Sequence, residues 1–220
     1  MSDPNAFSAA EQAAVYRAIF SRRDMRHFVA GKLPDGCLER LLAAAHAAPS
    51  VGFMQPWRFI RIQDESIRQQ LHAIVDEERI ATADALNTRH DEFMRLKVEG
   101  IYDCAEVLVV CLCDKREPYI FGRRTLPQMD LASVACAIQN MWLAARAEGV
   151  GMGWVSLFAP EKIAALLQLP ADAEAIAILC IGPVAEFYDK PMLEQEGWDV
   201  RKPLESLVME NRWNNAATPK

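Results

Sequence analysis

The spacing of apolar residues predicts two helices in the first part of the chain. Ser8 followed by Glu11 has the form of a capping box, and apolar residues then recur at helical spacing to about Ser21. A second helix is predicted between Asp35 and Pro49, because a proline ends a helical pattern. Its apolar stripe consists of Leu38, Leu41, Leu42 and Ala45.

The same spacing predicts helices in the middle of the chain. Asp64 can cap a third helix, and the charged segment 76–100 predicts a further one through Phe93 and Leu96. The apolar stripe of the third helix is Ile67, Leu71, Ile74 and Val75. A long helix over residues 127–148 is apolar almost all round, which is typical of a central or interfacial helix. One face of it carries Leu131, Val134, Ala135, Ile138, Trp142 and Ala145.

Four segments are predicted to be strands, namely residues 57–62, 107–113, 154–157 and 175–181. The run 107–113 is continuously apolar and rich in β-branched residues, so we expect it in the middle of a sheet with both faces covered. Gly149, Gly151 and Gly153 predict a loop before residues 154–157, and a short helix should open at Pro160. Strict alternation of strands and helices is absent, which favours an α+β arrangement over a doubly wound one.

The length and composition predict one domain that spans residues 1–220. The chain has 220 residues, 51% of them hydrophobic, which is enough for one substantial core. We expect residues from about 190 to 220 to form an extended C-terminal arm, because this segment carries large apolar anchors that a disordered end would lack. The anchors are Trp198, Leu204, Leu207 and Trp213. They are expected to pack on a second subunit, in a homodimer.

Charge and cysteine usage exclude several classes of protein. The formal net charge is −6, and no basic run is interleaved with aromatic residues, so nucleic acid is not an expected partner. No signal core or membrane-spanning stretch is present in the sequence, which predicts a cytoplasmic protein. Most of the six cysteines lie in apolar runs, so disulfides are not expected. Cys111 and Cys113 lack a second ligand pair, so no metal site is expected.

The glycines near residue 150 invite comparison with a dinucleotide site. A Rossmann fingerprint needs a strand, then glycines, then a helix N-terminus, whereas the predicted order here is helix, glycines, strand. One alternative is a helix C-cap at Gly149 with flexible glycines that turn the chain. The other is close approach of the backbone to a flat ligand, since glycine has no Cβ to block it. The residues alone leave both alternatives open.

Three arginines follow the first predicted helix and could bind a phosphate. Arg22, Arg23 and Arg26 can each make paired, charge-assisted hydrogen bonds to an anion. They could equally be surface charges at a helix C-terminus, with Asp24 as their counter-ion. Arginine neighbours lower the pKa of a carboxyl group while burial raises it, so the sequence leaves the protonation state of Asp24 open.

The sequence offers no signature of a hydrolase. Ser50 has no catalytic base beside it, and Ser156 lacks the glycine-flanked turn that presents a nucleophilic serine. The four histidines show no ligand spacing, so structural or solvent-exposed histidines are the better interpretation. Hydrolysis and metal catalysis are therefore disfavoured.

Five motifs carry a resemblance to the nitroreductase superfamily. Residues 22–28 and 48–57 resemble its two opening motifs, and residues 122–127, 129–133 and 151–158 extend the resemblance to one of its subgroups, from about Tyr16 to Trp213. The first motif usually reads R-R-S-x-R-x-F in that superfamily, whereas Asp24 replaces the serine here. With Asp24, the motifs resemble a subgroup whose substrate is reduced FMN. That subgroup uses O2 to fragment the flavin to 5,6-dimethylbenzimidazole, the lower ligand of vitamin B12, and erythrose 4-phosphate.

The resemblance implies a fold, an assembly and a set of site residues. The fold would be a mixed sheet flanked by helices, in a homodimer that exchanges extended arms and holds FMN between its subunits. Reduced FMN would come from a separate flavin reductase, and no metal is implied. The residues that would bind the flavin are Arg22, Arg23, Asp24, Met25, Arg26, Ser50, Gly52, Gln55, Leu96, Lys97, Gly153, Trp154, Val155, Ser156 and Arg201.

Within this set, the resemblance implies particular roles. Arg22, Arg23, Arg26 and Arg201 would bind the phosphate and ribityl chain, while Ser50 and Gln55 would meet the polar edge of the ring. Residues 153–156 would pass near the flavin N5 atom, and Leu96 and Lys97 would belong to a lid that excludes water. Asp24 would be the catalytic base, and Ser156 would donate a hydrogen bond at N5.

Two other functions remain open. One is an FMN-dependent NAD(P)H oxidoreductase of nitroreductase type, in which the flavin is a recycled prosthetic group. The other is a non-catalytic flavin carrier with the same fold, because binding and catalytic residues overlap. Asp24 and a tight lid favour flavin fragmentation over the first of these.

Overall fold

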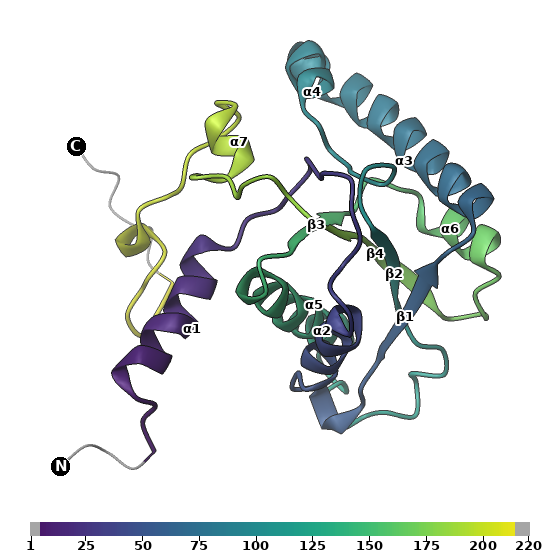
Figure 1. Cartoon of the computed structure of the whole chain (residues 1–220). Helices are drawn as coiled ribbons and strands as arrows, with labels where there is room; N and C mark the ends of the chain where they lie inside the picture. Colours follow the sequence, from purple (N-terminus) through teal and green to yellow (C-terminus); the bar gives the residue numbers. More distant parts are fainter. Residues whose placement is uncertain (1–4, 214–220) are drawn as a thin grey trace.

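A computed structural model describes residues 5–213 of the chain (Figure 1). The helices longer than one turn are α1 Ala9–Ser21, α2 Cys37–His46, α3 Glu65–Leu86, α4 His90–Arg95, α5 Met129–Ala147 and α6 Pro160–Leu167. The strands are β1 Trp57–Ile62, β2 Glu106–Leu112, β3 Gly151–Val155 and β4 Glu174–Gly182. Short helical turns are η1 Val51–Phe53, η2 Asn87–Arg89, α7 Met192–Gln195 and η3 Leu204–Ser206. The predicted α+β class is confirmed.

The sheet has the strand order β1-β2-β4-β3, and neighbouring strands are antiparallel. β2 lies inside the sheet, as its continuous apolar run predicted, and from Val107 to Leu112 every residue is buried. Among the described residues, a parallel pairing occurs at an isolated bridge between Asp24 and Met152, beside β3. Parallel pairing in the described chain is therefore confined to the β3 edge of the sheet, where Asp24 of the first motif lies.

Helices cover both faces of the sheet (Figure 1). α2 and α5 pack on one face in a cluster with side chains of β2 and β4, and α3 and α6 pack on the other. α5 is central, as predicted, but its buried face is displaced from the predicted stripe because Leu131 is exposed and Ala135 is half-buried. The buried apolar face of α5 is Val134, Ala137, Ile138, Met141, Trp142 and Ala145.

The predicted helix starts are confirmed by their caps. The Ser8 backbone amide donates to Glu11 at 2.9 Å and Ser8 Oγ accepts from the Glu11 amide at 3.4 Å, which completes the capping box of α1. Asp64 Oδ1 accepts from the Ser66 amide at 2.7 Å and begins α3. α3 then continues to Leu86, well beyond the predicted stripe, because no glycine or proline interrupts it.

The prediction of a glycine loop before the third strand is wrong. Gly149 does end α5 with a positive φ of 74°, but Gly151 and Gly153 lie within β3, which ends at Val155. A Cβ on Gly153 would lie 2.2 Å from the carbonyl oxygen of Met25. The glycine therefore admits the chain's own backbone, from the segment that carries the arginines.

The C-terminal tail, which we define as residues 188–213, lies beside α1, and both stand away from the body of the molecule (Figure 1). No residue of α1 is buried, and its apolar side chains Ile19 and Phe20 are 41% and 72% exposed. In the tail, Trp198 is half-buried against Phe93, whereas Leu204, Leu207 and Trp213 are exposed. Three of the four predicted anchors are thus exposed in the described chain, and residues 214–220 of the predicted arm lie outside the described part.

Candidate active site

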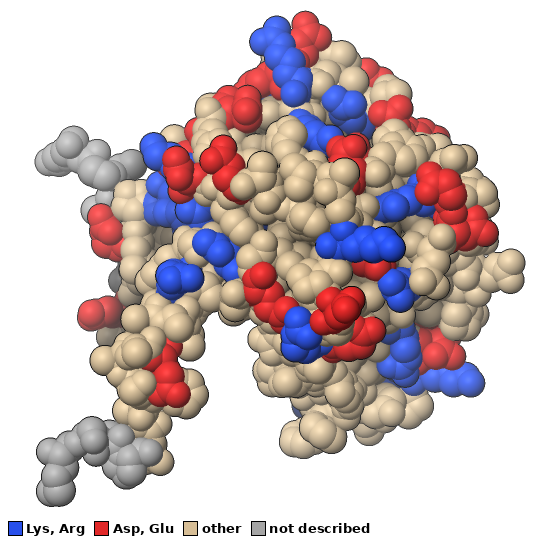
Figure 2. All heavy atoms as spheres, viewed as in Figure 1, with Lys and Arg blue, Asp and Glu red and all other residues tan. Residues whose placement is uncertain are grey.

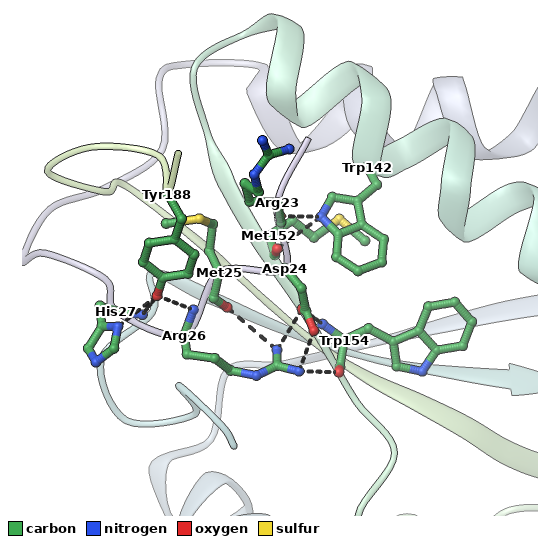
Figure 3. A network of polar contacts seen from close by, with 9 residues as sticks. All are labelled: Arg23, Asp24, Met25, Arg26, His27, Trp142, Met152, Trp154 and Tyr188. Atoms are coloured by element: carbon green, nitrogen blue, oxygen red, sulfur yellow. Dashed lines mark hydrogen bonds and ion pairs between the residues drawn. The ribbon is translucent and has the colours of Figure 1, made fainter. Parts of the chain in front are cut away.

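The segment that carries the arginines is fixed along β3 by backbone contacts (Figure 3). The Met25 amide donates to the Met152 carbonyl at 3.0 Å, next to the bridge between Asp24 and Met152. Trp142 Nε1, from α5, donates to the same carbonyl at 2.9 Å and to the Arg23 carbonyl at 3.2 Å. The central helix and the sheet edge therefore hold residues 23–25 in one conformation.

The start of the tail holds the same segment from the other side. The Tyr188 hydroxyl accepts hydrogen bonds from the backbone amides of Arg26 and His27, each at 3.2 Å (Figure 3). Arg23 Nη2 donates to the Asp189 carbonyl at 2.7 Å. Sequence reasoning missed Tyr188 and Asp189, since neither lies in a motif and the contacts span more than 160 residues.

A cavity of about 980 Å³ lies between the end of α1, this segment and the tail. We call it the tail cavity, and its volume suits a cofactor-sized molecule. Its apolar lining is Ile19, Phe20, Pro191, Met192, Leu193, Leu204 and Leu207, and its charged lining is Arg22, Arg23, Asp24, Asp189, Lys190, Arg201 and Lys202. Figure 2 shows Lys and Arg side chains gathered where the tail meets the end of α1.

The charges around the tail cavity favour an anion. Five cationic side chains line it against two carboxylates. Burial lowers the pKa of Arg22, Asp24 raises it, and the nearby positive charges of Arg23 and Arg201 lower it, so these three cations repel one another and Asp24 compensates them only in part. Arg23 Nε is buried without a hydrogen-bond partner among the described residues. A phosphate would neutralise the cluster and satisfy such a donor, so these residues fit the phosphate of FMN.

Asp24 places a carboxylate at the wall of this cavity. Its Oδ1 accepts from the Trp154 amide at 3.0 Å and from Arg26 Nη1 at 2.8 Å, and its Oδ2 accepts from Arg26 Nη2 at 2.7 Å. Burial raises the pKa of Asp24, while Arg26, the Trp154 amide and Arg22 act in the opposite direction. A carboxyl group whose pKa is raised is better matched to proton transfer near neutral pH.

Arg26 occupies a different position from the other two arginines. Its side chain is 9% exposed, and its guanidinium group donates to Asp24 and to the Trp154 carbonyl at 2.7 Å. It does not line the tail cavity, whereas Arg22, Arg23 and Arg201 do. The structure therefore brings three of the four predicted phosphate ligands together and separates Arg26 from them.

The other predicted site residues lie in separate places within one chain. Gly153, Trp154 and Val155 form part of β3 beside Asp24 and Met25, and Ser156 is exposed just after the strand. None of the four lines the tail cavity.

The predicted ring-binding loop lies between α2 and β1. Ser50 Oγ accepts from the Gln55 amide at 3.0 Å, and Gly52 has a positive φ of 53°. The Gln55 side chain lines a different cavity, together with His46 and Trp57. A single chain therefore does not bring this loop to the tail cavity.

The predicted lid residues belong to the segment after α4. Leu96 is buried in a cluster with Ala83 and Phe93, and Lys97 forms an ion pair with Asp103. They line a cavity with residues of α3 rather than the tail cavity. The predicted site is thus divided among several surfaces of one chain.

The motifs at residues 122–133 form a buried ionic network. Asp130, in the first turn of α5, forms ion pairs with two arginines: its Oδ2 lies 3.1 Å from Arg116 Nε and 3.0 Å from Arg123 Nη2. The side chains of Arg123 and Asp130 are each 7% exposed. Arg123 also donates to the carbonyl of Tyr119, so the network orders the loop before α5.

Cysteines and histidines form no metal centre in the described part of the chain. All six cysteines are free, and five of them are buried. No group of three or more potential metal-ligating side chains occurs among residues 5–213. No helix in this range is long and apolar enough to cross a membrane.

Residues 19–183 match the Nitroreductase family, and the chain belongs to that family. Among its relatives, the 5,6-dimethylbenzimidazole synthase of Rhodospirillum rubrum is 42% identical over 187 residues, which cover 83% of this chain and 87% of the relative. The protein of the same name from Rhodobacter capsulatus is 35% identical over 204 residues, which cover 90% and 97% of the two chains. These similarities confirm the resemblance carried by the five motifs.

Solved structures with low sequence identity share the fold. An iodotyrosine deiodinase bound to FMN and 3-iodo-L-tyrosine superposes with a TM-score of 0.70 at 21% identity, covering 90% of this chain and all of that chain. Nitroreductase A from Vibrio parahaemolyticus gives a TM-score of 0.68 at 22% identity, covering 91% and 77% of the two chains. The antiparallel sheet flanked by helices is therefore the fold of this family.

Proposed function

We propose that this protein fragments reduced FMN with O2 to 5,6-dimethylbenzimidazole and erythrose 4-phosphate. The observation that carries the proposal is the Asp24 carboxylate at the wall of a cavity with five cationic side chains. Relatives named 5,6-dimethylbenzimidazole synthase support the same reaction. Reduced FMN is the substrate, and a separate flavin reductase supplies it.

In this proposal, the residues around the tail cavity bind and orient the flavin. Arg22, Arg23 and Arg201 bind the phosphate through charge-assisted hydrogen bonds. Asp24 then lies near the ribityl chain and accepts or returns a proton during its cleavage. The reduced flavin supplies the electrons for the reaction with O2.

The ring-facing residues come together between two subunits in this proposal. Ser50, Gly52 and Gln55 meet the polar edge of the ring, and Ser156 donates to N5. Residues around Leu96 and Lys97 close the site against water. The exposed apolar side chains of α1 and of the tail support such an assembly, because a stable monomer seldom leaves many large apolar residues uncovered.

The proposed function is tested by supplying the purified protein with reduced FMN and air in the absence of a nicotinamide cofactor. We expect benzimidazole in the products. A flavin carrier would return intact FMN. An NAD(P)H oxidoreductase would also return intact FMN, and it would consume NAD(P)H steadily when oxidised FMN and an electron acceptor are added.

The protein should be an obligate homodimer. Ile19 and Phe20 of α1 and Leu204 and Leu207 of the tail are exposed in one chain, and covering them would bury a large apolar area. Light scattering or sedimentation at low micromolar concentration should give twice the chain mass of 24.7 kDa. A folded, flavin-binding monomer under these conditions would contradict this assembly.

Arg201 should act in binding through the flavin phosphate. Replacing Arg201 by Ala should weaken FMN binding by about tenfold or more, the scale of one charge-assisted hydrogen bond, and riboflavin should bind the wild type far more weakly than FMN. Fluorescence titration measures both affinities. Arg61→Ala removes an exposed arginine on β1, outside the tail cavity, and serves as the matched control. Equal affinity of the wild type for FMN and riboflavin would favour plain surface charge.

A further inference from the structure

The Asp24 carboxylate faces the tail cavity, whereas the Arg26 guanidinium group that pairs with it faces the protein interior. The Asp24 side chain is 44% exposed and lines the cavity, whereas the Arg26 side chain is 9% exposed and does not. A buried arginine of this kind cannot also meet a ligand in the cavity directly. Its effect on such a ligand must pass through Asp24.

The Arg26 guanidinium group is held by contacts that do not depend on Asp24. Nη2 donates to the Trp154 carbonyl at 2.7 Å, and the Arg26 backbone amide donates to Tyr188. The group lies against Gly153, where a Cβ would approach Arg26 Nη1 to 2.5 Å. β3 therefore forms a fixed seat for the guanidinium group, in which a Cβ at Gly153 would clash, while Tyr188 holds the Arg26 backbone.

This seat leaves the two oxygens of Asp24 unequal. Oδ1 accepts two hydrogen bonds, from the Trp154 amide and from Arg26 Nη1. Oδ2 accepts one, from Arg26 Nη2. An ionised carboxylate offers about four acceptor positions, two on each oxygen, so the position that stays open belongs to Oδ2.

We propose that Arg26 is a positioning residue. Its two terminal nitrogens, Nη1 and Nη2, hold the Asp24 carboxylate so that Oδ2 faces the substrate. The inference rests on the proposed function, since it assigns the atom of Asp24 that exchanges a proton with the flavin. Both guanidinium nitrogens are needed, because a single donor would let the carboxylate rotate about its last bond. Arg26 then contributes to the chemical step and little to the affinity for FMN.

The experiment compares Arg26→Ala and Arg26→Lys with the wild type. Each protein, in excess over reduced FMN, is exposed to air. The dissociation constant for FMN should stay within about threefold of the wild-type value. The yield of benzimidazole per bound flavin should fall about tenfold or more in both variants, since loss of orientation costs rate at the chemical step. Lysine keeps the positive charge but has a single terminal nitrogen, so the yield of Arg26→Lys should stay as low as that of Arg26→Ala.

Two further measurements separate a positioning role of Arg26 from a merely structural one: chemical rescue of Arg26→Ala, and the yield and affinity of Arg26→Lys. Guanidinium ion at millimolar concentration should restore part of the yield of Arg26→Ala, while sodium chloride of equal ionic strength should not. Should Arg26→Ala not fold, Arg26→Lys decides by its yield and its affinity. Arg61→Ala, with an exposed ion pair to Glu106, should match the wild type in both measurements.

Two outcomes would overturn the inference. FMN binding weakened tenfold or more with an unchanged yield per bound flavin would make Arg26 a phosphate ligand. A wild-type yield in Arg26→Lys would show that charge alone suffices. If the wild type itself forms no benzimidazole from reduced FMN, the proposed function fails, and that failure is visible before any variant is compared.

Discussion

Asp24→Asn should lower the yield of 5,6-dimethylbenzimidazole per bound flavin by about 10²-fold or more, the scale on which general acid–base help is lost. The variant should still bind reduced FMN and consume O2, and the flavin should return as oxidised FMN. The reason is that asparagine removes the basic carboxylate, whose Oδ2 accepts from Arg26 and whose Oδ1 accepts from the Trp154 amide at the cavity wall. Benzimidazole and FMN measured in one stopped reaction, at saturating protein, give the yield.

A second variant controls for the loss of the ion pair with Arg26. The amide of asparagine places a donor against the guanidinium group, which can loosen residues 23–26 in addition to removing the base. Asp24→Ser removes the carboxylate without that clash and introduces the residue that the first motif commonly carries in the superfamily. An undiminished yield per bound flavin in both variants would remove Asp24 from the catalytic residues and leave it as a neutraliser of its arginine neighbours.

Asp130→Ala should lower the free energy of unfolding by about 3–5 kcal/mol, because it leaves the buried Arg123 and the half-buried Arg116 without their carboxylate. Arg123 is buried as deeply as Asp130, and Arg116 Nε lies 3.1 Å from the same carboxylate oxygen. Urea unfolding measures the loss. Both proteins must be at equal concentration, since the stability of a dimer depends on it.

Glu77→Ala is the matched control for this prediction. Glu77 pairs with Lys162 between α3 and α6, but both side chains are largely exposed. Exposed ion pairs contribute little, so the urea midpoint of this variant should stay close to that of the wild type. A similar midpoint for Asp130→Ala and Glu77→Ala would show that the network orders the loop before α5 without stabilising the fold.

Local patterns were sufficient to predict most elements of the fold. The capping box at Ser8 and the cap at Asp64 depend on neighbours three residues apart or fewer, and β1 was predicted with its observed bounds. The position of β2 inside the sheet followed from its unbroken apolar run. These features are readable because their causes lie within a few residues of one another.

The glycines of β3 show where local patterns fail. Gly153 is a strand residue that pairs with Cys180 of β4, and it has no room for a Cβ because Met25, more than a hundred positions earlier, passes over it. No local signal distinguishes these long-range contacts from a flexible loop. Leu131 was expected in the buried stripe of α5, yet it is exposed in the described chain. The approach of Met25 to Gly153 and the exposure of Leu131 both depend on how distant segments pack in the folded chain, so neighbouring residues do not predict them.

The candidate site was predictable in its residue types and only partly in its arrangement. Arg22 and Arg23 of the first motif and Arg201 of the tail line one cavity, whereas Arg26, which has the same chemistry, does not line it. Arg26 is held away from the cavity by Asp24 and by the Trp154 carbonyl, and the contact with Trp154, 128 positions away, cannot be read from the motif. The tail contributes Lys190 and Lys202, which no motif had indicated.

A single turnover of reduced FMN with O2 distinguishes fragmentation of the flavin from its simple reoxidation. Anaerobically reduced FMN is bound to excess protein, mixed with air-saturated buffer without any nicotinamide, and the products are quantified by mass spectrometry. We expect one 5,6-dimethylbenzimidazole and one erythrose 4-phosphate for each flavin lost, with the remaining pyrimidine portion of the flavin released as a third fragment. Complete recovery of intact FMN, with neither product above the level of a protein-free sample, would contradict it.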